Sequence, residues 1–241
     1  MKKTLAAFAG LILITSCDKQ EKTGNLEISG NIKGLKKGTL YLKQLQDTVL
    51  VNIDTIQIDG DSKFTTAVNL KEAEMLYLFL DRGKTASIDN SLPFFAEAGK
   101  MTIETNLETY YAMAKVTGSK NQGLLEEYNT VKKRFIDQEL EIKVKDMEAS
   151  IKNKTLPETE IVKYENALKR RYLYTANFAM THKDFEVSPY VVIAETPNLG
   201  LGFIKQILDG LSPKVKASKY GKLLQQLYDE RLKTEGPVAL N

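Results

Sequence analysis

The sequence predicts an α+β protein, in which an N-terminal antiparallel β-sandwich or barrel-like domain precedes a helical hairpin and further helices. Three observations support this prediction. From Asn25 to Gly118, apolar residues recur at every second position between turns, which indicates short strands. From Ser119 onward they recur at steps of three and four, which indicates helices. Gly118 and Ser119 form a natural joint, so we expect a β domain over residues 25–118 and a helical segment over residues 119–241.

Seven or eight short strands are expected in the first segment. They begin around Leu26–Ile32 and continue at Thr39–Leu45, Val49–Ile58, Lys63–Val68, Met75–Leu80, Leu92–Ala96, Met101–Thr105 and Lys115–Thr117. Asp59-Gly60 is a hairpin signal, because glycine tolerates the positive φ of a type I′ turn, and Phe64 on the return strand should face inward. We also expect the strands on either side of Gly99 to pair with each other.

Two long helices should form an antiparallel hairpin, because a short break separates them. Ser119 and Gln122 fit a capping box at the start of the first helix. Asn153 and Lys154 interrupt the helical periodicity. Thr155 and Glu158 fit a second capping box at the start of the second helix. The apolar stripe of the first helix is Leu125, Ile136, Leu140, Val144, Met147 and Ile151. That of the second is Ile161, Tyr164, Leu168, Tyr172, Thr175 and Ala179.

The rest of the chain should also be helical. Ser188-Pro189 is a good start for a third helix ending near Glu195, since proline suits the first helical position. Phe203–Leu208 and Ser218–Lys233 continue the pattern, and Gly236-Pro237 should end it. The first helix also carries a second apolar line, formed by Leu124, Tyr128, Val131 and Phe135, which could cover the β domain or remain free.

The N-terminus has the pattern of an export signal. Lys2 and Lys3 precede an apolar stretch from Leu5 to Ile14, which is too short to span a membrane. The following Ile14-Thr15-Ser16-Cys17 resembles a bacterial lipobox, which implies cleavage before Cys17 and acylation of that residue. We therefore expect a signal peptide over residues 1–16, and a lipidated Cys17 followed by a polar tether over residues 17–24. The predicted location is the cell envelope, on a membrane that the sequence does not specify.

Charge and cysteine usage exclude several classes of protein. The full chain has 34 Lys and Arg against 31 Asp and Glu. Removal of Lys2 and Lys3 leaves 32 basic residues in a processed chain of 225, which is 241 less 16. A charge so near zero gives no electrostatic reason to expect nucleic acid as a partner. Lipidation of Cys17, the only cysteine, would leave no thiol for a disulfide or for redox chemistry.

The order of these features resembles a protein family. In the β domain the lipobox is followed by Gly30, Gly34 and Gly38, by Asp59-Gly60 before Phe64, and by Phe94-Phe95 before Gly99 and Ile103. The helical segment adds Thr117-Gly118-Ser119 at its start, then Ser188 before Tyr190, and finally Tyr220. The whole resembles the uncharacterised N-terminal β domain and helices of lipid-anchored thiol–disulfide oxidoreductases of Bacteroidota. In those proteins a thioredoxin-like module with a Cys-x-x-Cys pair begins about where Gly236-Pro237 lies here. This chain has no second cysteine, so the resemblance assigns no redox residue to any position.

No catalytic, cofactor-binding or metal-binding motif is evident, so we expect no enzyme activity and no cofactor. His182, the only histidine, is expected to be a capping or surface residue. Asp146, Glu148, Glu158 and Glu160 should be solvated partners of nearby lysines. Aromatic pairs that could line a groove are Tyr110-Tyr111 and Phe94-Phe95, in each of which one residue should be core; Lys36-Lys37 should form a solvated turn.

Three functions remain open. The first is a non-catalytic, lipid-anchored interaction module, which would bind an envelope protein or a second copy chiefly through residues 203–233. The second is an accessory part of a thiol–disulfide oxidoreductase whose catalytic module is missing or lies in a neighbouring reading frame. The third is a small-ligand or glycan binder, which a deep aromatic-lined groove in the β domain would favour.

Overall fold

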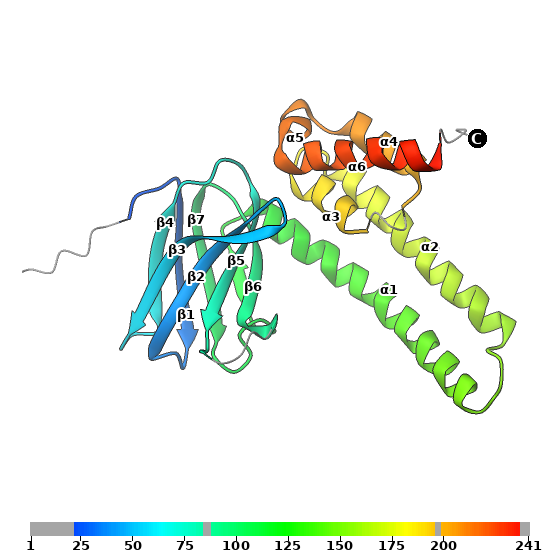
Figure 1. Ribbon diagram of the computed structural model, residues 1–241, viewed down its shortest axis with the longest axis horizontal. Helices are drawn as coiled ribbons and strands as arrows, with labels where there is room; N and C mark the ends of the chain where they lie inside the picture. The colour runs from blue at the N-terminus through cyan, green and yellow to red at the C-terminus, as the bar shows by residue number, and fades with distance from the viewer. Residues whose placement is uncertain (1–21, 84–87, 196–198, 237–241) are drawn as a thin grey trace, which may run out of the picture.

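The computed structural model describes residues 22–83, 88–195 and 199–236. The β domain lies at one end of the molecule and the helices at the other (Figure 1). A long helical hairpin, α1 and α2, runs away from the β domain, and the shorter C-terminal helices lie along its near half. The strands end at Thr117 and the first long helix begins at Lys120, so the periodicity of the sequence places the change correctly.

The β domain is a sandwich of two four-stranded sheets. Its strands are β1 (Leu26–Lys33), β2 (Lys37–Gln46), β3 (Val49–Asp59), β4 (Lys63–Val68), β5 (Glu74–Asp81), β6 (Ser91–Ala96), β7 (Gly99–Asn106) and β8 (Lys115–Thr117), with a 3-10 turn at Ile88–Asn90. One sheet has the order β4-β1-β7-β8 and the other β3-β2-β5-β6. The predicted α+β class is confirmed, and β4 and β8 have the predicted bounds.

The pairing of the strands differs from the prediction at two turns. Asp59-Gly60 does not close a hairpin within a sheet, because β3 and β4 belong to different sheets; Gly60 has φ +90° in a corner between them. The strands flanking Gly99 do not pair either, since β6 pairs with β5, and β7 pairs with β1 and β8. The β1–β7 pair is parallel, whereas the other strand pairs of the two sheets are antiparallel.

The interior of the sandwich is filled by the inward side of each strand. Leu26, Ile28 and Ile32 of β1 are buried while the residues between them face outward. They pack with Leu40 and Leu42 of β2 in one apolar cluster that includes residues of both sheets. Phe64 faces into the same cluster, as predicted. The domain therefore has a core of its own, built by the two-residue periodicity of its strands.

Six helices follow. They are α1 (Lys120–Ile151), α2 (Glu158–Thr181), α3 (Val187–Glu195), α4 (Leu201–Gly210), α5 (Pro213–Ala217) and α6 (Lys219–Glu235). The predicted break at Asn153 is present, with φ +52° at that residue. Gly236, with φ +76°, ends α6 as predicted, and the short helix α5 was not predicted.

Three of the predicted helix starts need correction. Ser119 caps α1 by accepting a hydrogen bond from the Gln122 backbone N–H at 3.0 Å, but the Gln122 side chain turns to Phe95 and Glu126 and does not complete the box. The N-cap of α2 is Pro157, with no side-chain cap in place of the predicted Thr155 box. The third helix begins at Val187, and Ser188 is not its cap: its hydroxyl donates to the Ala179 carbonyl.

Candidate interaction surface

The most unusual surface of the helical half is the apolar stripe of the first long helix. The residues from Ile136 to Ile151 follow one another at steps of four, four, three and four, so they share one side of α1. They are exposed by these fractions: Ile136 40%, Leu140 57%, Val144 46%, Met147 67% and Ile151 79%. The sequence predicted this stripe as the packing face of an amphipathic helix, and in the structure only its first member, Leu125, is buried.

The second apolar line of α1 packs within the chain instead. Tyr128 is buried, its ring stacks on that of Tyr174 of α2 with 5.5 Å between centroids, and its hydroxyl shares a 2.8 Å hydrogen bond with Thr175. Phe135 also contacts the ring of Tyr174. Leu124 packs in the cluster that joins the helices to the β domain. This line is therefore the seam between α1 and α2, and the predicted stripe lies beside it.

The exposed stripe of α1 lies on the same face of the hairpin as the exposed Ile161 and the half-buried Leu168 of α2. On α1 the centre of the stripe is displaced by about 130° from the midpoint of the seam residues Glu139 and Ile142, since each residue turns the helix by about 100°. Ile161 and Leu168 are displaced in the same sense, by about 110°, from Ala167, which is buried in the seam of α2. Because antiparallel helices are viewed from opposite ends, similar displacements in the same sense point to the same face. We name this the distal face: Ile136, Leu140, Val144, Met147 and Ile151 of α1 with Ile161 and Leu168 of α2.

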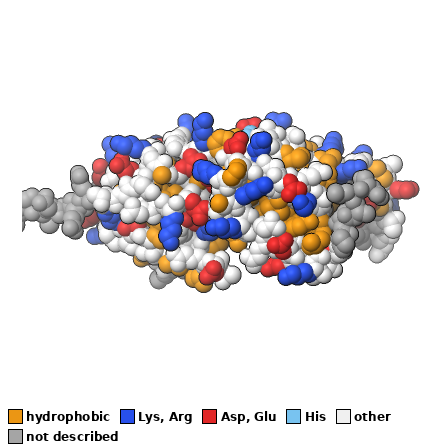
Figure 2. All heavy atoms as spheres, turned by 90° about the horizontal axis from the view of Figure 1, so that it is seen from above, with side chains coloured by type: hydrophobic (Ala, Val, Ile, Leu, Met, Phe, Trp, Pro, Cys, Tyr) orange, Lys and Arg blue, Asp and Glu red, His pale blue; other side chains and the backbone are white. Residues whose placement is uncertain are grey.

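The C-terminal helices cover the near half of this side of the hairpin. Ala176 and Ala179 of α2, on the same side of the helix, pack with Val192 of α3 and Ile204 of α4. The distal face is the continuation of this packing surface, farther from the β domain and without a covering helix (Figure 1). Hydrophobic side chains gather in patches on the helical half of the surface seen in Figure 2.

A buried ionic network marks the inner limit of the distal face. Arg171 of α2 binds Glu139 of α1 at 2.8 Å and Glu195 at the end of α3 at 2.6 Å. Lys132 adds a 3.3 Å contact to Glu195. These two carboxylates and Arg171 expose little of their side chains, so the charges compensate one another in a low-dielectric setting. The network fixes the end of α3 against the hairpin at the level where the exposed stripe begins, because Lys132 and Glu139 lie on either side of Ile136 in α1.

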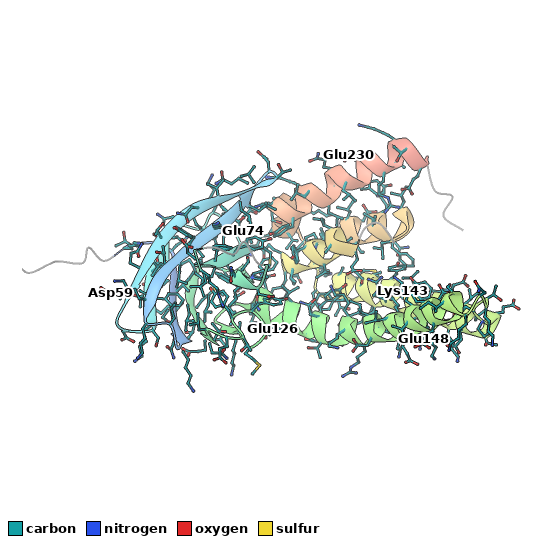
Figure 3. The ribbon with its side chains drawn as sticks, turned by 60° about the horizontal axis from the view of Figure 1, so that its bottom comes forward. Asp59, Glu74, Glu126, Lys143, Glu148 and Glu230 are labelled. Atoms are coloured by element: carbon teal, nitrogen blue, oxygen red, sulfur yellow. The ribbon has the colours of Figure 1, made fainter. Side chains whose placement is uncertain are left out.

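Charged residues bracket the distal face. Lys143 lies over the ring of Tyr164 at 5.6 Å and so belongs to the inner border of the stripe. Glu148 lies five residues on, about 140° further round α1, at the outer border (Figure 3). Glu160 binds Lys163 at 2.5 Å and Lys145 at 3.2 Å, and these hydrogen bonds hold the pKa of its carboxyl below its ordinary value.

The near end of the hairpin is fastened to the β domain. The Glu97 carboxylate accepts hydrogen bonds from the backbone N–H groups of Lys120 and Asn121, at 2.7 and 3.2 Å, and so caps α1. The Gln122 side chain accepts from the Phe95 N–H at 2.8 Å. The Tyr220 hydroxyl of α6 accepts from the Met75 N–H at 2.9 Å. The first N–H groups of α1, the Gln122 side chain and the Tyr220 hydroxyl thus hydrogen-bond the helices to β5, to β6 and to Glu97 just after β6.

Ion pairs and rings complete this junction. Lys219 of α6 binds the buried carboxylate of Glu74 at 2.6 Å, next to the helices in Figure 3. The Phe95 ring packs edge-on against Tyr190 and Tyr220. Asn121 donates to Glu186 at 3.0 Å, and Lys214 binds the same carboxylate at 2.9 Å. The β domain therefore holds the hairpin at a defined angle.

The predicted single-residue sites have structural roles. His182 is the C-cap of α2, as expected, with its Nδ1 2.9 Å from the Phe178 carbonyl. Of the four acids, Asp146, Glu148 and Glu158 are exposed and Glu160 pairs with lysines, as expected. No group of three His, Cys, Asp or Glu side chains that could hold a metal ion occurs in the described ranges.

The residues of the two aromatic pairs and of the lysine pair are either buried for structural reasons or exposed to solvent. Tyr110 is core, donating its hydroxyl to the Leu78 carbonyl at 3.1 Å, and Tyr111 is exposed. Phe94 lies in the sandwich core, while Phe95 points out of the sandwich but is covered by the helices. Lys36 and Lys37 are exposed at the turn into β2.

Two further expectations concern the chain ends. Cys17, the predicted lipidation site, lies outside the described residues. In residues 203–233, predicted as the partner-binding half, most apolar side chains are buried in the chain's own core; Phe203 and Leu223 are exposed. Within the part of the chain that the structure describes, no helix combines the length and the apolar character needed to cross a bilayer.

A groove of about 950 Å³ lies beside the edge strand β4. Most of its lining residues are polar, among them Lys22, Lys63 and Lys100 and hydroxyl-bearing residues such as Ser29 and Thr65. Its aromatic residue, Phe64, is 5% exposed, so the groove offers hydrogen bonds but no free ring for stacking on a sugar.

Residues 26–125 match the sequence profile of a domain of unknown function, DUF4369. The match spans the sandwich and extends into α1 as far as Leu125, which packs with Met75 and Phe95 of the β domain in the cluster that joins the β domain to the helices. Searches of curated proteins and of solved structures found no match.

Proposed function

We propose that this protein is a non-catalytic, lipid-anchored interaction module of the cell envelope, and that its distal face binds a protein partner. The observation that carries this proposal is the exposure of the distal face. Monomeric proteins rarely leave a contiguous apolar surface of this kind uncovered, and such surfaces are typical of interaction sites. The proposal moves the partner site from residues 203–233 to the distal half of the hairpin.

The sequence supports the address. The short apolar segment that ends in Ile14-Thr15-Ser16-Cys17 resembles a lipoprotein signal, and acyl chains on Cys17 would hold the protein at a membrane surface. A module confined to a surface meets its partners at a raised effective concentration, so a modest apolar face can suffice for binding.

The test is site-specific photo-crosslinking in intact cells. A photoreactive residue replaces Met147 on the distal face in one variant, and Glu104, exposed on β7 of the β domain, in the control. We expect a discrete protein adduct from position 147 and none from position 104. Equal yields from the two positions would contradict the proposal and leave ligand binding at the β4 groove as the better explanation.

A second candidate is an accessory part of a thiol–disulfide oxidoreductase. It is supported by the resemblance of the whole chain to the N-terminal part of such proteins, together with the match of residues 26–125 to a domain of unknown function. A Cys-x-x-Cys codon pair in another reading frame past Asn241 would favour it. That observation needs only the downstream nucleotide sequence.

A further inference from the structure

We propose that the distal face binds the distal face of a second copy of this chain, with the two α1 helices antiparallel. This inference rests on the proposed function, because it names the partner of the same surface. Three independent properties of the face support a second copy: the spacing of its apolar residues, the position of the rest of the molecule, and the placement of its charges.

The apolar spacing on α1 is symmetric. Ile136 and Ile151 lie equally far from a midpoint between Lys143 and Val144, and so do Leu140 and Met147. A two-fold axis through that midpoint, perpendicular to α1, places Ile136 opposite the second copy's Ile151. It places Leu140 opposite the second copy's Met147, and the two Val144 side chains close to the axis. A two-fold interface requires a surface that is complementary to itself, and this stripe meets that requirement.

The remainder of the molecule selects the antiparallel arrangement. The β domain and helices α3–α6 all lie toward the near end of the hairpin (Figure 1). A parallel pair would bring two β domains into the same space, whereas an antiparallel pair sends them to opposite ends. The network around Glu195 holds the end of α3 against α1 between Lys132 and Glu139, at the level of Ile136 where the stripe begins. Ile151 of a second hairpin therefore reaches Ile136 beside the end of α3, which limits how far the two copies overlap.

The charges on α2 are complementary under the same symmetry. The contacts of Lys145 with Glu160 and of Lys143 with Tyr164 place the midpoint of the stripe near residues 160–164 of α2. Glu158 and Lys169 are exposed on the side of α2 next to the distal face, about equally far before and after this level. The axis therefore brings each Glu158 near the second copy's Lys169, which gives two symmetric ion pairs.

The size of the contact indicates a weak dimer. The stripe is about 22 Å long at about 1.5 Å per residue, and two helices give a width of about 20 Å. The flat footprint is thus about 450 Å² per copy, or about 900 Å² in total, which is below the range of about 1,200–2,000 Å² for stable interfaces and typical of weak, transient ones. Confinement of both copies to one membrane would strengthen such a dimer through effective concentration.

Cysteine crosslinking tests the arrangement. The lipid-free processed chain carries Cys17→Ser, and Ile136→Cys or Ile151→Cys is added, both at exposed positions. We expect a disulfide-linked dimer when the two variants are mixed and little from either variant alone. Glu104→Cys, on the β domain, is the matched control and should give none. Self-crosslinking of each variant as efficient as the mixture would overturn the antiparallel arrangement.

Charge reversal tests the same geometry without cysteines. In sedimentation equilibrium, Glu158→Lys should weaken the dimer by about tenfold, and Lys169→Glu added to it should restore the dimer, since the swapped pairs are again opposite. Leu140→Lys should give monomers while leaving the helical circular dichroism unchanged, because Leu140 is 57% exposed. A Cys17→Ser chain that stays monomeric at millimolar concentration would overturn the inference. An adduct from position 147 to a different protein in cells would also overturn it, yet would still support the proposed function.

Discussion

Arg171 and Glu195 are joined by a 2.6 Å contact between the guanidinium Nη1 and a carboxylate oxygen, across the line where α2 meets the end of α3. The same guanidinium donates through Nε to Glu139 of α1 at 2.8 Å. One cation therefore ties three helices together at the boundary between the covered and the uncovered halves of the hairpin.

Loss of Arg171 should destabilise the protein strongly. Arg171→Leu leaves Glu139 and Glu195 buried with only Lys132 beside Glu195, and an uncompensated buried charge costs about 3–5 kcal/mol. Urea unfolding measures the loss. Lys133→Ala, which removes an exposed ion pair with Asp137, is the matched control and should cost less than about 1 kcal/mol. Similar losses from the two variants would show that the network does not fix α3.

Glu186 should make stability depend on pH. Burial alone would raise the pKa of its carboxyl, but hydrogen bonds from Lys214 and Asn121 outweigh burial and hold that pKa below its ordinary value. The carboxylate therefore contributes stability above the ordinary glutamate pKa of about 4.3, and this contribution is lost as pH falls through the lower folded-state pKa.

The measurement compares urea midpoints at neutral pH and in acid, at pH values below the ordinary glutamate pKa of about 4.3. Glu186→Gln should unfold more easily than the wild type at neutral pH, and the difference should shrink in acid. Glu148→Gln, at an exposed position, is the control and should follow the wild type. A constant difference at all pH values would mean that the Glu186 charge contributes nothing.

The isolated β domain, residues 25–118, should melt cooperatively but at a lower temperature than in the full chain. Its own core is complete, yet removal of the helices uncovers Phe95 and Met75, which are 0% and 5% exposed in the intact protein. Exposing one such side chain costs about 1.5–3 kcal/mol. Calorimetry measures the melt, and Phe95→Thr should reduce dye binding to the uncovered surface. A molten state without a transition would show that sandwich and helices form one core.

Cys17 should carry lipid. A radiolabelled fatty acid fed to cells should label the wild-type protein and not Cys17→Ala, because the thioether and the new amino group are created only at that residue. Ser16→Ala is a control for the surrounding segment and should keep the label, since the residue before the cysteine need only be small. Labelling of Cys17→Ala at the wild-type level would refute the lipobox assignment.

The purified processed protein should have no thiol–disulfide exchange activity. Exchange requires a thiolate that attacks a disulfide, and lipidation of the only cysteine removes it. Insulin reduction by the lipidated protein should equal that of the Cys17→Ser chain. Turnover above this control would contradict the non-catalytic assignment.

The positions of the strands could be predicted because alternation is a local property. Lys63–Val68 and Lys115–Thr117 have the same bounds in sequence and structure. The partners of the strands are not local. Asp59-Gly60 supplies the flexible backbone of a tight turn whether the next strand stays in the same sheet or enters the other one. Only the packing of Phe64 and its neighbours against both sheets decides between these outcomes.

The packing face of α1 was not predictable from periodicity. The helix carries an apolar stripe at Ile136–Ile151 and, beside it, a seam that includes Glu139. A glutamate at a packing position lowers the apolar signal of the true seam. Its burial is possible because Arg171, distant in sequence, supplies the opposite charge. The sequence of α1 thus indicates two possible packing faces, and only the ion pair between Glu139 and the distant Arg171 shows which of them packs against α2.

The parallel pairing of β1 with β7 has a consequence for the time course of synthesis. Leu26 of β1 lies opposite Gly99 of β7 on one side and opposite Val68 of β4 on the other. A chain made at about 5–20 residues per second completes β7 about 4–15 seconds after β1. During that interval both edges of β1 begin without partners, so the nascent strand is open to wrong pairing. We expect the yield of folded protein to depend on a holding chaperone that keeps β1 apart until β7 arrives.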